Sequence, residues 1–227
     1  MKNSRTLAMA QVALLGAIIL ILAFTPGIGY IPLGVTRATI IHIPGIVGAI
    51  LLGPKKGALL GFLFGLTSFI NNTINPTVTS FTFTPFYNGG NFWSLVICFV
   101  PRILVGVVPY FVYKGLKLIG NKLSKKEGGK VRTFFTKLFG TNPLPLAAAG
   151  LAGSLTNTVL VMSLIGICFG KAYSAAKDIL PDALWGVIMG VVGVNGVPEA
   201  ILAAVLTAAI AGALLRFLGK KAPKTSA

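Results

Sequence analysis

The chain has 227 residues, of which 55% are apolar and only 11% are charged, and its formal net charge is +16. A soluble domain spends roughly a quarter of its residues on charge, so this composition excludes an ordinary soluble domain and favours a chain that lies in lipid. The basic excess does not indicate a nucleic-acid-binding protein, because the basic residues lie between apolar stretches rather than along a polar face with interleaved aromatics. The sequence therefore predicts a single membrane domain over residues 1–227.

The predicted elements are apolar stretches separated by Pro, Gly and basic residues. A bilayer core about 30 Å thick takes roughly 20 helical residues, so this length accommodates about six spans. The predicted transmembrane helices cover residues 7–24, 38–53, 57–74, 92–113, 144–169 and 198–218. A shorter apolar piece, 184–194, contains three glycines and is expected to be a lid-like or half-inserted segment packed on the protein. The predicted fold class is all-α, a polytopic membrane protein.

Basic residues predict the orientation of these helices, because Lys and Arg near the ends of spans accumulate on the cytoplasmic side. With the N-terminus inside, sixteen of the twenty basic residues fall in cytoplasmic segments, and three, Arg37, Lys171 and Lys177, fall in outer loops. Eight lie in the single segment 114–137, which is expected to attract anionic lipid headgroups. Six helices with the N- and C-termini in the cytoplasm keep every basic cluster on one side.

The outer ends of the predicted helices carry little net charge and many Asn, Thr, Tyr and Phe side chains. Such a lining suits a neutral or singly charged polar metabolite. Two segments are expected to roof a pocket there, the loop 25–37 and the uncharged loop 75–91. Helix capping is the alternative role for each polar residue taken singly, but the cluster is too dense for capping alone. The candidate binding residues of this region are Arg37, Asn71, Asn75, Tyr87, Asn88 and Asn91.

Three further candidates lie in or at the ends of predicted spans. Arg102 lies about ten residues into its helix, roughly 15 Å deep, where a charge is expensive and faces a cavity or a partner. It is expected either to anchor a substrate carboxylate or to form a structural ion pair or a contact with backbone carbonyls. Asn195 opens the last helix as a cap, and the free N–H groups there favour acceptor groups of a ligand. Glu199 is a binding candidate whose alternative role is to offset the helix dipole.

The sequence does not predict an enzyme, a metal site or a cofactor in this chain. It contains four acidic residues, one histidine and no Gly-Lys-Ser/Thr phosphate loop. His42, the only histidine, lies among apolar neighbours, where packing is a commoner role than ligation. Cys98 and Cys168 lie inside apolar stretches and predict buried thiols rather than a disulfide.

The first predicted helix carries alanines at helical spacing, namely Ala10, Ala13 and Ala17. Small residues four apart allow another helix to approach closely in lipid. The partner of this face is either another protein or another helix of the same chain.

Together these features resemble the substrate-binding S-components of energy-coupling factor (ECF) vitamin transporters, over nearly the whole chain. The resemblance is carried by the alanines of the first helix, by the run at 31–87, which begins IPLGVTRATIIHIPG, and by NGVPEA at 195–200. It implies a prokaryotic multi-pass cell-membrane protein that binds a water-soluble vitamin outside. A transmembrane coupling protein (T-component) and two cytoplasmic ATPases would then use ATP to drive import. Ala13 and Ala17 match the motif that packs on the coupling helices.

The run at 31–87 is most similar to the pantothenate branch of this family. Pyridoxine, a hydroxymethylpyrimidine and folate stay open as substrates, because each also offers hydroxyls or ring nitrogens to such a lining. The alternative from a different class is an autonomous secondary transporter. It is disfavoured because the sequence has no detectable inverted repeat and few membrane-embedded acids to couple ions.

Overall fold

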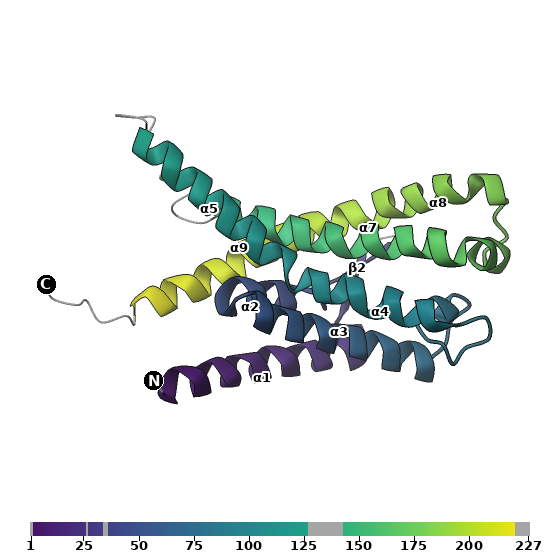
Figure 1. Cartoon of the computed structure of the whole chain (residues 1–227), viewed down its shortest axis with the longest axis horizontal. Helices are drawn as coiled ribbons and strands as arrows, with labels where there is room; N and C mark the ends of the chain where they lie inside the picture. The colour runs from purple at the N-terminus through teal and green to yellow at the C-terminus, as the bar shows by residue number, and fades with distance from the viewer. Residues whose placement is uncertain (1, 26, 34–35, 127–142, 221–227) are drawn as a thin grey trace, which may run out of the picture.

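The protein is an elongated bundle of helices that run along its long axis (Figure 1). The structure, a computed structural model, describes residues 2–25, 27–33, 36–126 and 143–220. The long helices are α1 (Lys2–Phe24), α3 (Pro54–Ile74), α7 (Pro143–Ala176) and α9 (Val197–Lys220). The shorter helices are α2 (Ile43–Leu52), α4 (Phe92–Val105), α5 (Val108–Lys126) and α8 (Leu184–Val191). The remaining elements are η1 (Ser80–Thr82), η3 (Pro181–Ala183), the π-helical turn η4 (Val192–Gly196), and the strands β1 (Tyr30–Leu33) and β2 (Thr36–Thr39).

The helices have the length and surface of membrane-spanning segments. Among the described residues, five stretches are long and apolar enough to cross a bilayer, and α2 is a shorter apolar helix. The five stretches are Arg5–Phe24, Pro54–Ile74, Phe92–Gly120, Pro143–Ala176 and Pro181–Phe217. Large apolar side chains such as Leu14, Ile201 and Val205 are exposed on the outside of the bundle, where lipid rather than water is their favourable neighbour. The predicted fold class, a polytopic all-α membrane protein, is confirmed.

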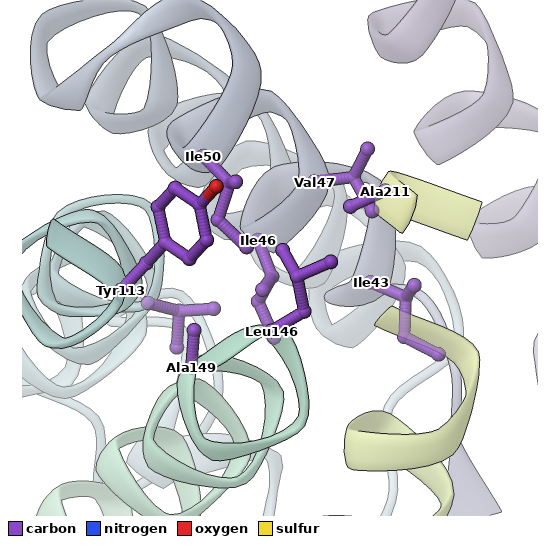
Figure 2. Packing of buried hydrophobic residues seen from close by; sticks show 9 residues of the cluster. Ile43, Ile46, Val47, Ile50, Tyr113, Leu146, Ala149 and Ala211 are labelled. Atoms are coloured by element: carbon purple, nitrogen blue, oxygen red, sulfur yellow. The ribbon is translucent and has the colours of Figure 1, made fainter. Parts of the chain in front are cut away.

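Helix α2 lies at the centre of the bundle. It contacts α1, α3, α5, α7 and α9, and every residue from Ile43 to Ile50 is buried. Its side chains gather with Tyr113 of α5, Leu146 of α7 and Ala211 of α9 in one apolar cluster (Figure 2). A helix that is apolar all round is suited to this central position, because it presents no face to a polar solvent.

Close packing of α3 on α4 is made possible by glycines. Gly57, Gly61 and Gly65 recur every four residues and therefore lie on one face of α3. A Cβ atom on Gly61 would strike the carbonyl oxygen of Arg102, and one on Gly57 would strike that of Gly106. Small residues of this kind let two helix backbones touch in a membrane. The glycine face thus fixes the position of α4, and with it the position of the Arg102 backbone.

Four elements differ from the sequence-based prediction. The transmembrane helix expected at 38–53 is the ten-residue α2, which is too short to be counted among the span-length stretches, and residues 38 and 39 belong to β2. The helix expected at 92–113 is two helices, because the chain turns between Val105 and Val108, where Pro109 in the first turn of α5 has no N–H to continue the ladder. The lid-like piece expected at 184–194 is α8, which continues through η4 directly into α9. The loop expected at 25–37 contains an antiparallel hairpin, in which Tyr30 pairs with Thr39.

The ends of the bundle differ in charge. Both chain termini and the far end of α5 lie at one end, and the connections α3–α4 and α7–α8 lie at the other (Figure 1). Lys114, Lys117 and Lys122 are carried by α5 toward the end that holds the termini. Residues 127–137 of the basic segment, and Lys221 and Lys224, lie outside the described residues. The cytoplasmic location of this end stays a prediction of the basic-residue distribution.

The glycine face of α3 leads to a matched pair of substitutions. Gly61→Ala introduces a methyl group where the α4 backbone lies, so we expect a destabilisation of about 1–3 kcal/mol as the two helices are forced apart. Gly115→Ala is the control, since a Cβ there meets nothing within 4 Å and alanine has the higher helix propensity. Thermal unfolding in detergent should give a lower melting temperature for the first variant and an equal or higher one for the second. Equal melting temperatures for both would show that α3 and α4 do not touch at Gly61.

Candidate substrate-binding site

A polar cavity of about 110 Å³ lies where α1, β2, α3, α4 and α7 meet. Its apolar lining is Ala23, Ile41 and Phe64. Its polar lining is Thr39, Thr67, Ser68, Asn71, Asn72, Arg102 and Asn157. Polar side chains are expensive inside a membrane protein unless they face one another or a ligand, so this concentration marks the bundle's candidate binding site.

Arg102 supplies the positive charge of this cavity. Its side chain is only 7% exposed, and Nη1 donates a hydrogen bond to the Ile97 carbonyl oxygen at 2.8 Å. The guanidinium carbon lies 5.0 Å from the ring centre of Phe83 and 5.8 Å from that of Phe64, so the cation is held against two aromatic rings. The contact with a backbone carbonyl is one of the alternatives that the sequence left open for Arg102. Because the side chain also lines the cavity, a ligand carboxylate that enters would meet the guanidinium.

The end of α3 contributes amide groups and binds the loop 75–91. Asn71 and Asn72 both line the cavity, and Asn75 donates from Nδ2 to Oδ1 of Asn71 at 3.1 Å. The hydroxyl of Ser80 in η1 donates to Oδ1 of Asn72 at 2.9 Å. The loop is also tied to α4, because the Ser94 hydroxyl donates to the Phe81 carbonyl oxygen at 2.6 Å. The loop 75–91 therefore folds over the end of α3, and we call it the cover loop.

Glu199 holds the β-hairpin in place from α9. Its Oε1 accepts a hydrogen bond from the backbone N–H of Thr39 at 2.8 Å, and the hydroxyls of Thr39 and Thr158 also bond to its carboxylate. Thr39 in turn lines the cavity. Glu199 thus holds β2, and with it Thr39, against the cavity. This hydrogen bond accounts for the half-buried carboxylate without a ligand contact or an effect on the dipole of α9.

Asn157 lines the cavity from the middle of α7 and was not among the sequence-based candidates. Its Oδ1 is buried and has no hydrogen-bond partner among the described residues, so it can accept a hydrogen bond from a ligand hydroxyl or N–H. A lone amide in the middle of an apolar span is the signal that identifies it. Thr39, Thr67 and Ser68 were also missed, since Ser and Thr are common inside membrane helices and give no such signal.

The other sequence-based candidates lie elsewhere. Asn91 caps α4, with Oδ1 accepting from the Trp93 N–H at 2.9 Å, and capping was the alternative role considered for it. Tyr87 and Asn88 are exposed in the cover loop, and Asn195 lies in η4. The side chain of Arg37 lies outside the described residues, although its backbone pairs with Pro32 in the hairpin. Of the candidates, the described cavity lining includes Asn71 and Arg102.

The volume of the cavity limits what it holds in this conformation. Ligand pockets typically measure roughly 300–1,000 Å³, well above the 110 Å³ of this cavity. A ligand of many atoms therefore needs more room than the cavity offers in this conformation. The chemistry of the lining favours a small molecule with one anionic group for Arg102, and with amide or hydroxyl groups for Asn71 and Asn157.

This sequence matches a protein-family model and is similar to bacterial transporters. The family described as "ECF transporter, substrate-specific component" matches residues 7–211. The pantothenic acid transporter PanT of Lactococcus lactis subsp. cremoris is 39% identical over 185 residues, which make up 79% of each chain. The pantothenate transporter PanT of Leuconostoc mesenteroides subsp. mesenteroides is 31% identical over 221 residues, or 95% of each chain. The resemblance stated from the sequence is thereby confirmed.

The bond between Glu199 and the hairpin predicts a change in hydrogen exchange. Glu199→Ala removes the acceptor of the Thr39 N–H, and hydrogen bonds to charged groups contribute roughly 1.5–3 kcal/mol, so that amide should exchange about tenfold faster or more. Glu199→Gln retains a carbonyl acceptor and should give a smaller increase. Hydrogen–deuterium exchange followed by mass spectrometry of peptides covering 36–41 measures the effect, with α2 peptides as the internal reference. Unchanged exchange at Thr39 in Glu199→Ala would exclude this role of the carboxylate.

Proposed function

Because the chain belongs to the substrate-specific components of ECF transporters, we propose that it binds pantothenate at the outer side of the membrane for import. The observation that carries the proposal is the convergence of Arg102, Asn71 and Asn157 on one cavity. Pantothenate has a carboxylate at one end, an amide in the middle and two hydroxyls at the other end. A guanidinium, three carboxamides and three hydroxyls line the cavity, and they complement these groups in kind.

Arg102 is the residue that favours pantothenate over other vitamins. Pyridoxine and hydroxymethylpyrimidine carry no carboxylate, so they would leave the guanidinium without an anionic partner from the ligand. Folate carries two carboxylates and a bicyclic ring, and it demands a larger expansion of a cavity of about 110 Å³. A singly charged, flexible and small acid fits these limits best. Tyr87, Asn88, Asn75 and Asn195 would then contribute when the cover loop and the hairpin close over the ligand.

Import requires partners, which we propose are a T-component and two cytoplasmic ATPases. Hydrolysis of ATP is assigned to those subunits, and this chain is assigned neither catalysis nor a cofactor. The proposed docking face is an apolar groove of about 420 Å³ between α1 and α3. Ala13, Gly16 and Ala17 form its α1 side, and Ala10 is exposed one turn earlier on the same helix. Small exposed side chains in a groove allow a partner helix to pack at short distance.

The first test of this function is the loss of charge at Arg102. Removing one partner of a hydrogen bond to a charged group costs roughly 1.5–3 kcal/mol, so Arg102→Ala should weaken pantothenate binding by about 10- to 150-fold. The affinity for pantothenol, the uncharged alcohol analogue, should fall much less. Isothermal titration of the purified chain with both ligands makes the comparison. Equal losses for both ligands would make Arg102 structural, and unchanged pantothenate binding in a well-folded variant would exclude this cavity.

The second test separates binding from transport. Ala13→Trp or Ala17→Trp fills the α1–α3 groove, so each should abolish vitamin uptake by the assembled complex while the isolated chain binds the vitamin normally. Ile21→Trp is the matched control, because Ile21 is exposed on α1 but lies outside the described lining of the groove. Uptake into proteoliposomes and co-purification with the partner subunits are the readouts. Uptake by the isolated chain without ATP would instead support an autonomous transporter.

A further inference from the structure

A second and larger cavity lies at the end of the bundle opposite the chain termini. Its volume is about 590 Å³, within the roughly 300–1,000 Å³ of typical ligand pockets. Gly89 and Asn91 of the cover loop form one side, residues 166–172 and 174 of α7 form another, and Pro181 and Leu184 complete it. The described linings of this cavity and of the Arg102 cavity have no residue in common.

The backbone of α7 is irregular in the wall of this cavity. Phe169 has φ −128° and ψ 16°, outside the helical region, while the residues on either side continue as helix. Non-helical backbone at the membrane is found where it is buried in protein or lines a polar cavity, because lipid offers no hydrogen bonds. The Phe169 ring is buried and packs edge-on against the Phe81 ring, with 5.6 Å between the ring centres, so the kink is held by the protein core.

Two polar side chains of α7 line the cavity one turn apart. Ser174 is only 4% exposed, and its hydroxyl has no hydrogen-bond partner among the residues that the structure describes. A buried hydroxyl without a partner is unfavourable by roughly 1–3 kcal/mol, so it is suited to a ligand that completes its bonding. Lys171, three residues earlier, lies on the same side of the helix and brings a positive charge to the rim. The acidic residues of this end, Asp178 and Asp182, are outside the described lining.

We propose that this cavity is a second binding site, which captures the carboxylate of the vitamin before the vitamin enters the Arg102 cavity. The Lys171 ammonium attracts the carboxylate, the Ser174 hydroxyl donates to it, and the larger volume admits the whole molecule while the inner cavity is contracted. This inference rests on the proposed function, because it takes pantothenate as the ligand. The phosphate of an outer-leaflet lipid has the same oxyanion chemistry, so the experiment includes both sources.

Cys168 offers a direct reporter, because it lines this cavity and is half-buried, whereas Cys98 is fully buried. The rate of Cys168 alkylation by a maleimide is measured on the purified full chain in detergent, with increasing concentrations of pantothenate. We expect pantothenate to slow the reaction in the wild type and in Arg102→Ala, in which the inner site is weakened. Pantothenol at equal concentrations should protect Cys168 much less.

Variants of the cavity test the assignment of its residues. The double substitution Lys171→Gln with Ser174→Ala should raise the concentration for half-protection by roughly fivefold or more, since one screened charge and one hydrogen bond are lost. Lys177→Gln, an exposed lysine at the same end but outside the described lining, is the matched control and should retain protection. Equal protection in the double variant, or equal protection by pantothenol, would overturn the proposal.

Further measurements distinguish the two sources of the oxyanion and the two binding sites. Protection by phosphatidylglycerol in nanodiscs, without protection by pantothenate, would identify a lipid site and overturn the capture site. Tight pantothenate binding by titration without protection of Cys168 would remove the outer site and leave the proposed function intact. Absence of any tight binding in the wild type would remove the proposed function itself.

Discussion

A guanidinium inside a membrane protein is the constraint on which the half of this structure around Arg102 depends. The cost of burying Arg102 is offset by the Ile97 carbonyl oxygen and by two aromatic rings, and each of these requires a fixed neighbour. Phe64 comes from α3, and Phe83 comes from the cover loop. The same charge therefore ties α3, α4 and the loop together around one point.

The glycine face of α3 allows α4 to come close enough for these contacts of Arg102. Without side chains at Gly57, Gly61 and Gly65, the α4 backbone reaches that of α3, and the Arg102 side chain extends from a helix that is already in contact. Separating the helices by the width of a methyl group would move the guanidinium relative to Phe64 and Asn71. Helix packing and much of the polar lining of the cavity are thus set by the same pair of helices.

The sequence was sufficient for the features that lipid imposes. Long apolar stretches have few other stable forms, which is why the membrane-spanning fold was predictable. A charge at depth is costly enough to make Arg102 a candidate, and the dense polar cluster at the end of α3 made Asn71 another; both line the same cavity. Asn91, a binding candidate, caps α4, which was the alternative role considered for it, because the same residue types serve both purposes. The hairpin was missed since short strands with mixed side chains give no periodic signal, and its position depends on Glu199, 160 residues away from Thr39.

The shortness of α2 has a mechanical consequence for the bundle. Ten residues of helix extend about 15 Å, roughly half of the hydrocarbon thickness, and the chain before α2 continues as a two-stranded hairpin. A helix surrounded by five others resists deformation, whereas a hairpin of four residue pairs, anchored at its end by one carboxylate, opens at a far smaller cost. The packing around α2 is therefore expected to yield last, and the hairpin beside the Arg102 cavity first.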